Sequence, residues 1–322
     1  MPSIFLTGGT GFVGGAVLRR LSSDTRSSYR LMVGVRRPGA QFPEGVVPVV
    51  GGRDDIFSAG SYLSEIDVVI HAAARVHVMN ETAGDVLEAF RQVNTEATLA
   101  LARKAAQAGV KRFVFISSIK VNGEGTLPGR PYRADDLPSP TDPYGISKLE
   151  AERGLQALSA ETGMEVVIIR PVLVYGPGVK ANFRGMMNWL RRGVPLPFGA
   201  INNQRSLVAL DNLVDLIVAC IDHPAAANQV FLVSDGEDLS TTQLLIRMGH
   251  ALGRPARLLP APMCFLSILF RLLGKKATAQ RLLGSLQVDI DKTRTLLNWV
   301  PPVNVEDALS ATAKDYLESC VG

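Results

Sequence analysis

Three residues have the types and the order that oxidation of an alcohol requires, namely Ser118, Tyr144 and Lys148. Tyr144 and Lys148 are four positions apart, so on a helix they share one face. An ammonium group beside a phenol favours the phenolate and is expected to lower the pKa of the tyrosine. Such a tyrosine can exchange a proton with a sugar or alcohol oxygen near neutral pH, and Ser118 can hydrogen-bond the same oxygen. These residues predict hydride transfer between a nicotinamide and the carbon that bears this oxygen.

A tyrosine followed four residues later by a lysine is common by chance, and a solvated helix face is the usual explanation. The order of the motifs is more specific than the pair. A glycine-rich turn opens the chain, Ser118 ends an apolar run that begins at Arg112, and the Tyr144–Lys148 segment follows Pro143.

The glycine-rich turn predicts a dinucleotide site. An apolar run, residues 3–6, leads into the segment Thr7 to Gly14, and apolar residues then recur at helical spacing. Gly8 allows the tight turn, Gly11 lets the backbone approach a pyrophosphate, and Gly14 lets the helix pack against the strand. The helix N-terminus adds partial positive charge. The alternative is a tight turn in another doubly wound protein. The residues expected to touch the cofactor here are Gly8, Thr10, Gly11, Phe12, Val13 and Gly14.

The second expected strand, residues 29–35, indicates which dinucleotide binds. An NAD site usually has an acidic residue at its end, to hold the ribose hydroxyls. Arg36 and Arg37 stand there instead, and guanidinium groups can bind a 2′-phosphate through paired hydrogen bonds. We therefore expect NADP(H) in preference to NAD(H), with a solvated basic loop as the alternative.

The rhythm of the remaining elements indicates an α/β fold, a doubly wound parallel sheet of the Rossmann type. Further strands are expected at 46–50, 67–71, 112–116 and 165–170, with helices at 90–108 and 143–160. After Pro171 we expect a helix at 183–192, strands at 207–210 and 230–233 that return to the main sheet, and a mostly helical remainder. The expected dinucleotide-binding domain is 1–172 plus about 206–233. The expected substrate lobe, smaller and C-terminal, is 173–205 plus 234–322.

Composition narrows the class of protein. The chain has 322 residues, of which 47% are hydrophobic and 20% charged, as in soluble globular proteins. The net charge is only +4 without a basic block, which argues against nucleic acid as a partner. Three widely spaced cysteines and four scattered histidines predict no disulfide framework and no metal site. With no signal peptide, the cytoplasm is the expected location.

The longest apolar stretch, residues 258–273, is interrupted by Pro260, Pro262 and Arg271. It is too short to span a bilayer, so no transmembrane segment is expected. It predicts a buried or amphipathic helix, with a peripheral membrane contact as the lesser alternative.

The whole chain resembles the extended short-chain dehydrogenase/reductase family, especially its nucleotide-sugar epimerases, dehydratases and reductases. The resemblance is carried by the glycine loop, by Ser118, Tyr144 and Lys148, and by the runs Arg170 to Gly178, Gln204 to Val208 and Leu297 to Pro301. It implies a UDP-sugar substrate and a homodimer formed by the helices expected at 90–108 and 143–160, with a monomer as the alternative. Further expected cofactor contacts are Ala72, Ala73, Ala74, Asn94, Ser117, Tyr144, Lys148 and Pro171. The expected substrate-binding residues are Lys120, Asn122, Asn182, Arg205 and Arg281.

The residues after Ser118 discriminate among members of this family. Sugar 4,6-dehydratases have an Asp-Glu pair there, whereas this chain has Ile119 and Lys120, so a dehydratase is not expected. Lys120 and Asn122 are expected either to face the sugar or to lie on a surface loop. The segment 75–80, with His77, could also reach the substrate.

Two chemistries use the same three residues. Because Arg36 favours NADPH, the first expectation is a 4-ketoreductase that acts on a UDP-4-keto-6-deoxy-N-acetylhexosamine in surface polysaccharide (O-antigen) biosynthesis. The alternative is a UDP-hexose or UDP-N-acetylhexosamine 4-epimerase. A non-catalytic NADP-binding sensor or assembly factor is a third possibility, although such relatives commonly lose the Tyr or the Lys.

Overall fold

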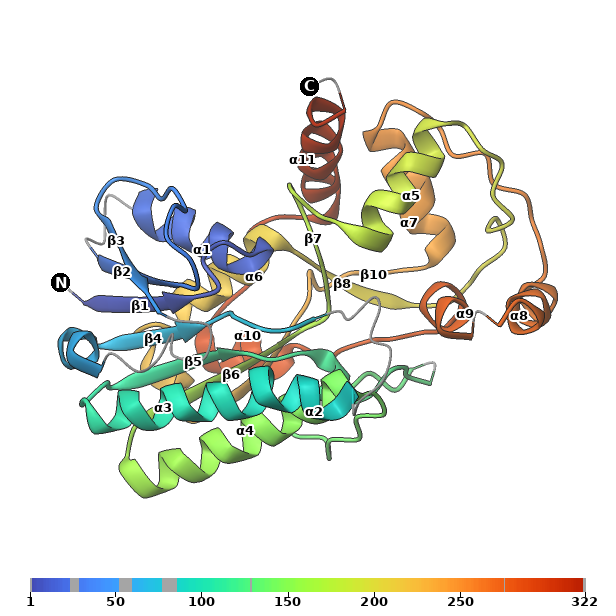
Figure 1. Cartoon of the computed structure of the whole chain (residues 1–322). Coiled ribbons are helices and arrows are strands. Elements are labelled where there is room, and N and C mark those ends of the chain that lie inside the picture. The colour runs from blue at the N-terminus through green and yellow to red at the C-terminus, as the bar shows by residue number, and fades with distance from the viewer. Residues whose placement is uncertain are drawn as a thin grey trace.

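The computed structural model describes residues 2–23, 29–51, 60–76, 86–127, 129–274 and 276–320. A large parallel sheet covered by helices forms one part of the molecule, and a smaller lobe with a short second sheet forms the other (Figure 1). The segment 77–80, which includes His77, lies outside the described residues.

The main sheet has seven strands in the order β3-β2-β1-β4-β5-β6-β9, all parallel. The strands are β1 (Ser3–Thr7), β2 (Arg30–Val35), β3 (Val46–Val50), β4 (Val68–His71), β5 (Arg112–Ile116), β6 (Glu165–Pro171) and β9 (Val230–Val233). The central strands are buried on both faces, which is why they read as continuous apolar runs in the sequence. The predicted doubly wound α/β fold is confirmed.

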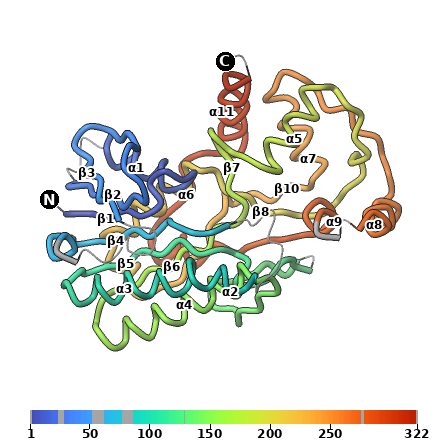
Figure 2. The backbone as a smooth tube through the Cα atoms, in the orientation of Figure 1, coloured from blue at the N-terminus to red at the C-terminus, as the bar shows by residue number. Residues whose placement is uncertain are grey.

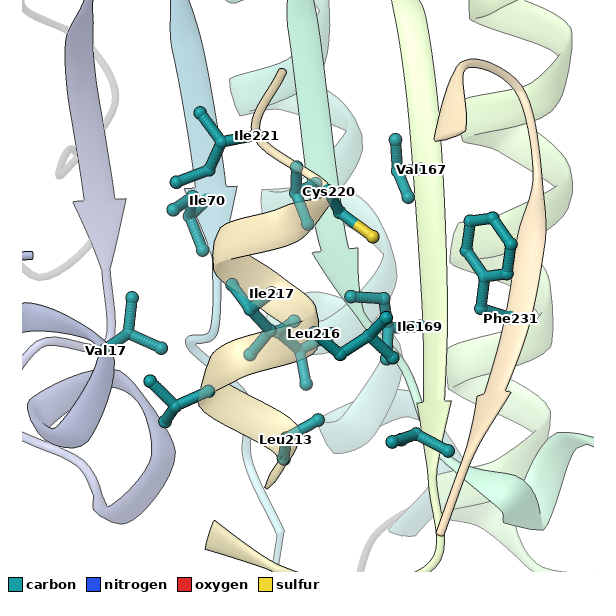
Figure 3. Packing of buried hydrophobic residues seen from close by; sticks show 14 of the residues in the cluster. Val17, Ile70, Val167, Ile169, Leu213, Leu216, Ile217, Cys220, Ile221 and Phe231 are labelled. Carbon is teal, nitrogen blue, oxygen red and sulfur yellow. The ribbon is translucent and has the colours of Figure 1, made fainter. Parts of the chain in front are cut away.

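Alternate residues of each strand face different helices. In β1, Ile4 and Leu6 belong to one core cluster and Phe5 to another, as the period of a strand requires. The first cluster is covered by α1 (Phe12–Ser23), α6 (Leu210–Ala219) and α10 (Asp291–Leu297), and the other by α3 (Ala97–Gln107) and α4 (Pro143–Thr162). Figure 3 shows Leu216 and Ile217 of α6 beside strand residues such as Ile169.

Helix α4 has clear start and stop signals. The side chain of Asp142 accepts a hydrogen bond from the Gly145 N–H at 2.6 Å, and Pro143 occupies the first turn. Gly163 ends the helix with φ of 77°, a conformation that glycine adopts without strain. These signals fix the helix that carries Tyr144 and Lys148 within two residues of the predicted range.

The helix expected at 90–108 is confirmed as continuous helical backbone, but it contains a π turn that the sequence did not predict. The structure has α2 (Val86–Arg91), a π-helical turn η2 (Gln92–Glu96) and then α3. Asn94 in the π turn is fully buried, and Thr95 donates to the Ser147 carbonyl at 2.8 Å. Such wide turns are frequent at functional sites, and here the turn directs polar side chains toward α4.

The smaller lobe has a three-stranded sheet in the order β10-β8-β7. Its strands are β7 (Leu173–Tyr175), β8 (Arg205–Ala209) and β10 (Asp238–Leu239). Its helices include α5 (Ala181–Arg191), α7 (Thr241–Ala251), α8 (Met263–Leu272), α9 (Lys276–Leu283) and α11 (Val305–Glu318).

Three short 3₁₀ turns connect elements along the described part of the chain. They are η1 (Gly60–Glu65), η3 (Ile119–Val121) and η4 (Pro224–Ala226).

The prediction that residues 207–210 return to the main sheet is wrong. This segment is β8, which pairs with β7 and β10, and only the strand at 230–233 joins the main sheet. Val208 packs into the core beside the main sheet, whereas Leu207 packs into the core of the smaller lobe. A short strand buried on both faces does not reveal its partners from composition. The exact domain boundaries stay a prediction.

Among the described residues, every helix falls short of the length and apolarity needed to cross a bilayer.

Candidate active site

The glycine loop is shaped for close approach by a ligand. Gly8 has φ of 76°, and a Cβ on it would lie 2.7 Å from the Ala72 carbonyl carbon. The Gly11 N–H donates to the Gly8 carbonyl at 2.8 Å, and a Cβ on Gly14 would collide with that same oxygen. Helix α1 begins at Phe12 with Thr10 and Gly11 exposed before it. Residues of this kind fit a pyrophosphate on backbone N–H groups at a helix N-terminus.

This loop lies where the strand order reverses. β1 has β2 on one side and β4 on the other, so successive crossovers leave a crevice at the carboxyl ends of these strands. The half-buried residues Ala72, Ala73 and Ala74 follow β4, and the Ala72 N–H donates to the Thr7 carbonyl at 3.2 Å. Their small side chains leave room beside the glycine loop, as predicted for a cofactor.

His71 supports the loop from below. Its Nδ1 lies 2.7 Å from the Thr7 hydroxyl and its Nε2 lies 2.9 Å from the Thr98 hydroxyl. Burial lowers the pKa of His71 to about 3, and the nearby Lys148 ammonium contributes in the same direction. The ring is therefore neutral at physiological pH. In the sequence, the only indication of this role is the position of His71 at the end of an expected strand.

Asn94 joins the loop after β4 to helix α4. Its Oδ1 accepts from the Arg75 N–H at 2.9 Å, while its Nδ2 donates to the Arg75 carbonyl and to the Ser147 hydroxyl, both at 3.1 Å. The expected burial is confirmed. Its position beside Arg75 holds the wall of the crevice, and a direct contact with the cofactor stays a prediction.

Ser118, Tyr144 and Lys148 come together at the carboxyl end of β5. Ser118 lies two residues beyond the strand, and its hydroxyl accepts from the Lys120 N–H at 3.3 Å and hydrogen-bonds the Tyr144 phenol. Lys148 Nζ donates to the Ile116 carbonyl at 2.8 Å. Two distant segments therefore bring the Ser118 hydroxyl to the Tyr144 phenol and the Lys148 ammonium to the end of β5.

The prediction that Lys148 lowers the pKa of Tyr144 is wrong for the protein alone. Burial and the Asp142 carboxylate raise the pKa of Tyr144, and the hydrogen bond with Ser118 acts against them. Burial lowers the pKa of Lys148 to about 7, although Glu152 acts in the opposite direction. Near neutral pH this lysine is therefore only partly charged, which weakens the effect that its spacing predicted.

Behind these residues lies a buried polar network that the sequence did not reveal. The Ser117 hydroxyl donates to Glu152 at 2.5 Å, and Arg170 donates to the same carboxylate through Nε at 3.0 Å. Arg170 also donates to Asn122 Oδ1 at 2.9 Å, and Asn122 Nδ2 donates to the Arg133 carbonyl at 3.1 Å. Every member is charge-paired or hydrogen-bonded, as buried polar groups require.

This network changes the interpretation of three predicted site residues. Asn122 is only 2% exposed with both ends of its amide engaged, so its placement gives no support to a contact with the sugar. The Ser117 hydroxyl donates to Glu152. Pro171 ends β6, buried opposite Val233 of β9. The cofactor contacts expected of Ser117 and Pro171 stay predictions.

Lys120 connects the serine segment to the helix that carries Tyr144. Its ammonium forms ion pairs with Asp142 and, at 3.1 Å, with Glu124. Although burial alone would raise it, the hydrogen bonds from Lys120 and Gly145 hold the pKa of Asp142 below its usual value. Lys120 is half-buried, so it lies at the surface of the site and fixes the start of α4.

Two arginines form a candidate anion site in the smaller lobe. Arg205 begins β8 and donates to the Gly284 carbonyl at 3.0 Å. Burial lowers the pKa of Arg205, and the Arg281 guanidinium nearby lowers it further. Two cations this close favour an anion between them. Asn182 is exposed in the first turn of α5, and no contact with this pair is seen.

The remaining predicted residues can be placed briefly. Arg36 and Arg37 follow the end of β2 and are exposed. Among the described residues there is no group of three or more His, Cys, Asp or Glu side chains that could hold a metal ion.

Comparisons with known proteins agree with this geometry. The model of the NAD dependent epimerase/dehydratase family matches residues 4–234. A Vibrio cholerae protein named UDP-glucose 4-epimerase is 48% identical over 99% of this chain and 97% of its own length. An Escherichia coli protein named N-acetyl-alpha-D-glucosaminyl-diphospho-ditrans,octacis-undecaprenol 4-epimerase is 26% identical over 96% of this chain and 94% of its own.

A solved structure has the same fold. The UDP-N-acetylglucosamine 4-epimerase from Bacillus cereus superposes with a TM-score of 0.78 at 19% identity, and the match covers 99% of both chains.

Proposed function

Because the chain belongs to the NAD dependent epimerase/dehydratase family, we propose that it interconverts the two C4 epimers of a UDP-hexose or UDP-N-acetylhexosamine. The observation that carries the proposal is the meeting of Ser118, Tyr144 and Lys148 at the carboxyl end of β5, beside a loop whose glycines fit a dinucleotide. The Vibrio cholerae relative supports the choice of an epimerase, because its name gives that reaction.

The proposed mechanism assigns a step to each residue. Tyr144 Oη takes the proton of the C4 hydroxyl and later returns it, while the Ser118 hydroxyl donates a hydrogen bond to the C4 oxygen. A dinucleotide held by the glycine loop would supply the acceptor and donor for the hydride at C4. Lys148, when protonated, favours the phenolate form of Tyr144. Arg205 and Arg281 hold the diphosphate.

This proposal ranks the epimerase above the 4-ketoreductase that the sequence put first. The reductase expectation depended on Arg36 and on overall resemblance, whereas the 48% identical relative supports the epimerase. The exposed pair Arg36 and Arg37 remains the one observation that favours a reductase, so that reaction is the second candidate, and an O-antigen role is part of it.

A dehydratase is not proposed. Elimination of water across C5 and C6 needs acid and base groups after the serine, but Ile119 is buried there and Lys120 is ion-paired with Asp142.

For the cofactor, we propose that the site accepts NADP(H) as well as NAD(H). Arg36 and Arg37 supply the charge that a 2′-phosphate requires, while the family model is that of NAD enzymes. Replacing both arginines with alanine is expected to weaken NADP binding about tenfold or more and to leave NAD binding within about twofold. Fluorescence titration of the reduced dinucleotides measures both, and equal losses would contradict the assignment.

Two further expectations belong to this proposal. A homodimer would form through α2, α3 and α4, where Gly154 lets α4 approach Leu99 of α3 closely. Light scattering coupled to gel filtration measures the mass directly. A cytoplasmic location rests on the three cysteines, which are free thiols in the structure.

The function is tested by incubating the protein with UDP-glucose or UDP-N-acetylglucosamine and no external reductant. The expected product is the matching galacto-configured sugar, separated by ion-exchange chromatography and absent with Tyr144→Phe. The lipid-diphosphate-linked sugar named for the Escherichia coli relative completes the panel. NADPH consumption with a UDP-4-keto sugar, without any epimerised product, would overturn the epimerase and establish the reductase.

A further inference from the structure

Helix α8 carries a stripe of large apolar side chains on its outer surface. Phe265, Ile268, Leu269, Leu272 and Leu273 follow the spacing of one helix face. Their exposed fractions are 58%, 59%, 40%, 80% and 59%. We call these five residues the α8 outer face. A surface helix normally has polar residues on its solvent side, whereas this one has apolar residues there.

The inner side of the same helix is already used for packing. Leu266 is 1% exposed, and Met263 and Phe270 pack against the core of the smaller lobe. Apart from Ser267 and Arg271, the helix therefore has apolar residues on both its inner and its outer side. Other strongly exposed apolar residues, such as Leu137 and Val300, lie far from α8 in the sequence, and exposed apolar residues of this kind need no explanation one by one.

The stretch of sequence that contains α8 carries charged residues of one sign. Residues 239–288 contain seven Lys and Arg residues and no Asp or Glu, in a chain whose net charge is only +4. Arg271 lies in the last turn of α8, and Arg254, Arg257 and Arg281 lie on the flanking segments. A protein surface with basic residues around apolar ones is complementary to an anionic lipid headgroup layer over hydrocarbon.

The corner formed by α8 and α9 lies at the outer end of the smaller lobe, away from the main sheet (Figures 1 and 2). A hollow between the two helices is lined by Ser267, Arg271 and Gln280 among others. The α8 outer face is thus a projecting edge that a flat surface could reach.

We propose that the α8 outer face docks the protein on the surface of a bilayer that contains anionic phospholipids. Phe265, Ile268 and Leu272 enter the boundary between headgroups and acyl chains, and Arg271 at the end of the helix contacts a lipid phosphate. The helix lies in the plane of the interface and does not cross it, in agreement with its ten residues.

Docking would bring the candidate anion site close to the membrane. α9 follows α8 almost directly and carries Arg281, and Gly284 just beyond α9 accepts the hydrogen bond of Arg205. The proposal goes beyond the proposed function and does not depend on it, because lipid binding is measured without turnover.

The test is co-sedimentation of the purified full chain with vesicles at physiological salt. Vesicles of phosphatidylcholine with phosphatidylglycerol are expected to bind the protein, and pure phosphatidylcholine vesicles at least tenfold less. The double variant Phe265→Ser, Leu272→Ser is expected to bind at least tenfold more weakly, and Arg271→Gln several-fold more weakly. Leu137→Ser, which changes an even more exposed apolar residue (91%) elsewhere, is the matched control and should bind like the unaltered protein.

Three results would overturn the proposal. The first is no binding of the unaltered protein to anionic vesicles, and the second is equal binding by the double variant. The third is a change from dimer to monomer in the double variant, measured by sedimentation velocity, without any vesicle binding by the unaltered protein. That result would assign the α8 outer face to a contact between copies of the chain. Circular dichroism checks that the double variant is folded, and the epimerase assay is scored separately.

Discussion

The carboxyl edge of the main sheet and the α8 corner of the smaller lobe differ in which side chains they bury. At the sheet edge, polar and charged groups such as Lys148, Glu152 and Arg170 are buried and each has a partner. At the α8 corner, apolar groups such as Phe265 and Leu272 are exposed.

The side chains at the sheet edge have their partners within the protein, whereas those of the α8 outer face are exposed and could be covered by a binding partner. Buried polar groups are stable only when they are fully paired, so the sheet edge holds its catalytic groups in fixed positions. Removing exposed apolar groups from water lowers the free energy, and this requires a partner that covers them. The first region is therefore built for chemistry and the second for attachment.

The largest effect is expected at the proton-transferring phenol. Tyr144→Phe should reduce turnover on the order of 10²- to 10⁴-fold, because it removes the general acid and base, while dinucleotide binding persists. Tyr316→Phe, which removes a hydroxyl bonded to Asn188 in the smaller lobe, is the matched control and should stay within a few-fold. Steady-state kinetics with UDP-sugar measures both, and similar losses in the two variants would contradict a catalytic role.

A buried ion pair should be costly to break. Arg170→Met leaves the Glu152 carboxylate buried without its main partner and should lower the free energy of unfolding by about 3–5 kcal/mol. Lys111→Met breaks the exposed pair with Asp67 and should cost far less, because solvent screens an exposed ion pair. Urea denaturation compares them. Equal costs would mean that the sheet edge is no more tightly organised than the surface.

Helix α8 should respond differently on its two sides. Leu266→Ala opens a cavity in the core of the smaller lobe and should lower the free energy of unfolding by about 2–5 kcal/mol. Leu272→Ala, on the outer face, should change it by about 0.5 kcal/mol or less. Thermal unfolding of both variants without lipid is the measurement, and a large cost at Leu272 would show that its side chain is covered in solution.

The neutral ring of His71 should make the sheet edge sensitive to acid. Its pKa is about 3 in the folded protein against an ordinary 6.5, so below pH 6.5 the unfolded chain binds a proton that the folded protein does not. Stability therefore falls as the pH drops from 6.5 toward 3, by at most about 1.4 kcal/mol per pH unit. His71→Gln should lose this component of the slope. Parallel slopes for both proteins in urea titrations at pH 4–7 would contradict the assignment.

Much of the large sheet could be predicted from the sequence. β5 and β9 match their expected ranges, because buried parallel strands are continuous apolar runs bounded by turns. The sequence also singled out the glycine loop and the pair Tyr144 and Lys148, because their spacing follows from local geometry, and their roles stay predictions.

Features that depend on distant partners could not be predicted. The π turn at Asn94 exists because its side chain reaches Arg75 and Ser147, and no local pattern specifies those contacts. The burial of Asn122 depends on Arg170, which lies 48 positions away in the chain. The exposure of the α8 outer face could not be predicted either, because an apolar run indicates a helix but not which of its sides is buried.

The most direct test of the central claim follows the hydride at C4. A UDP-sugar carrying deuterium at C4 is incubated with the protein and catalytic amounts of dinucleotide, and the product is examined by nuclear magnetic resonance. The account predicts a C4 epimer that retains the deuterium, with no net change in dinucleotide absorbance, because the hydride leaves and returns within one site. Loss of the label, or product formation only when NADPH is consumed, would contradict it.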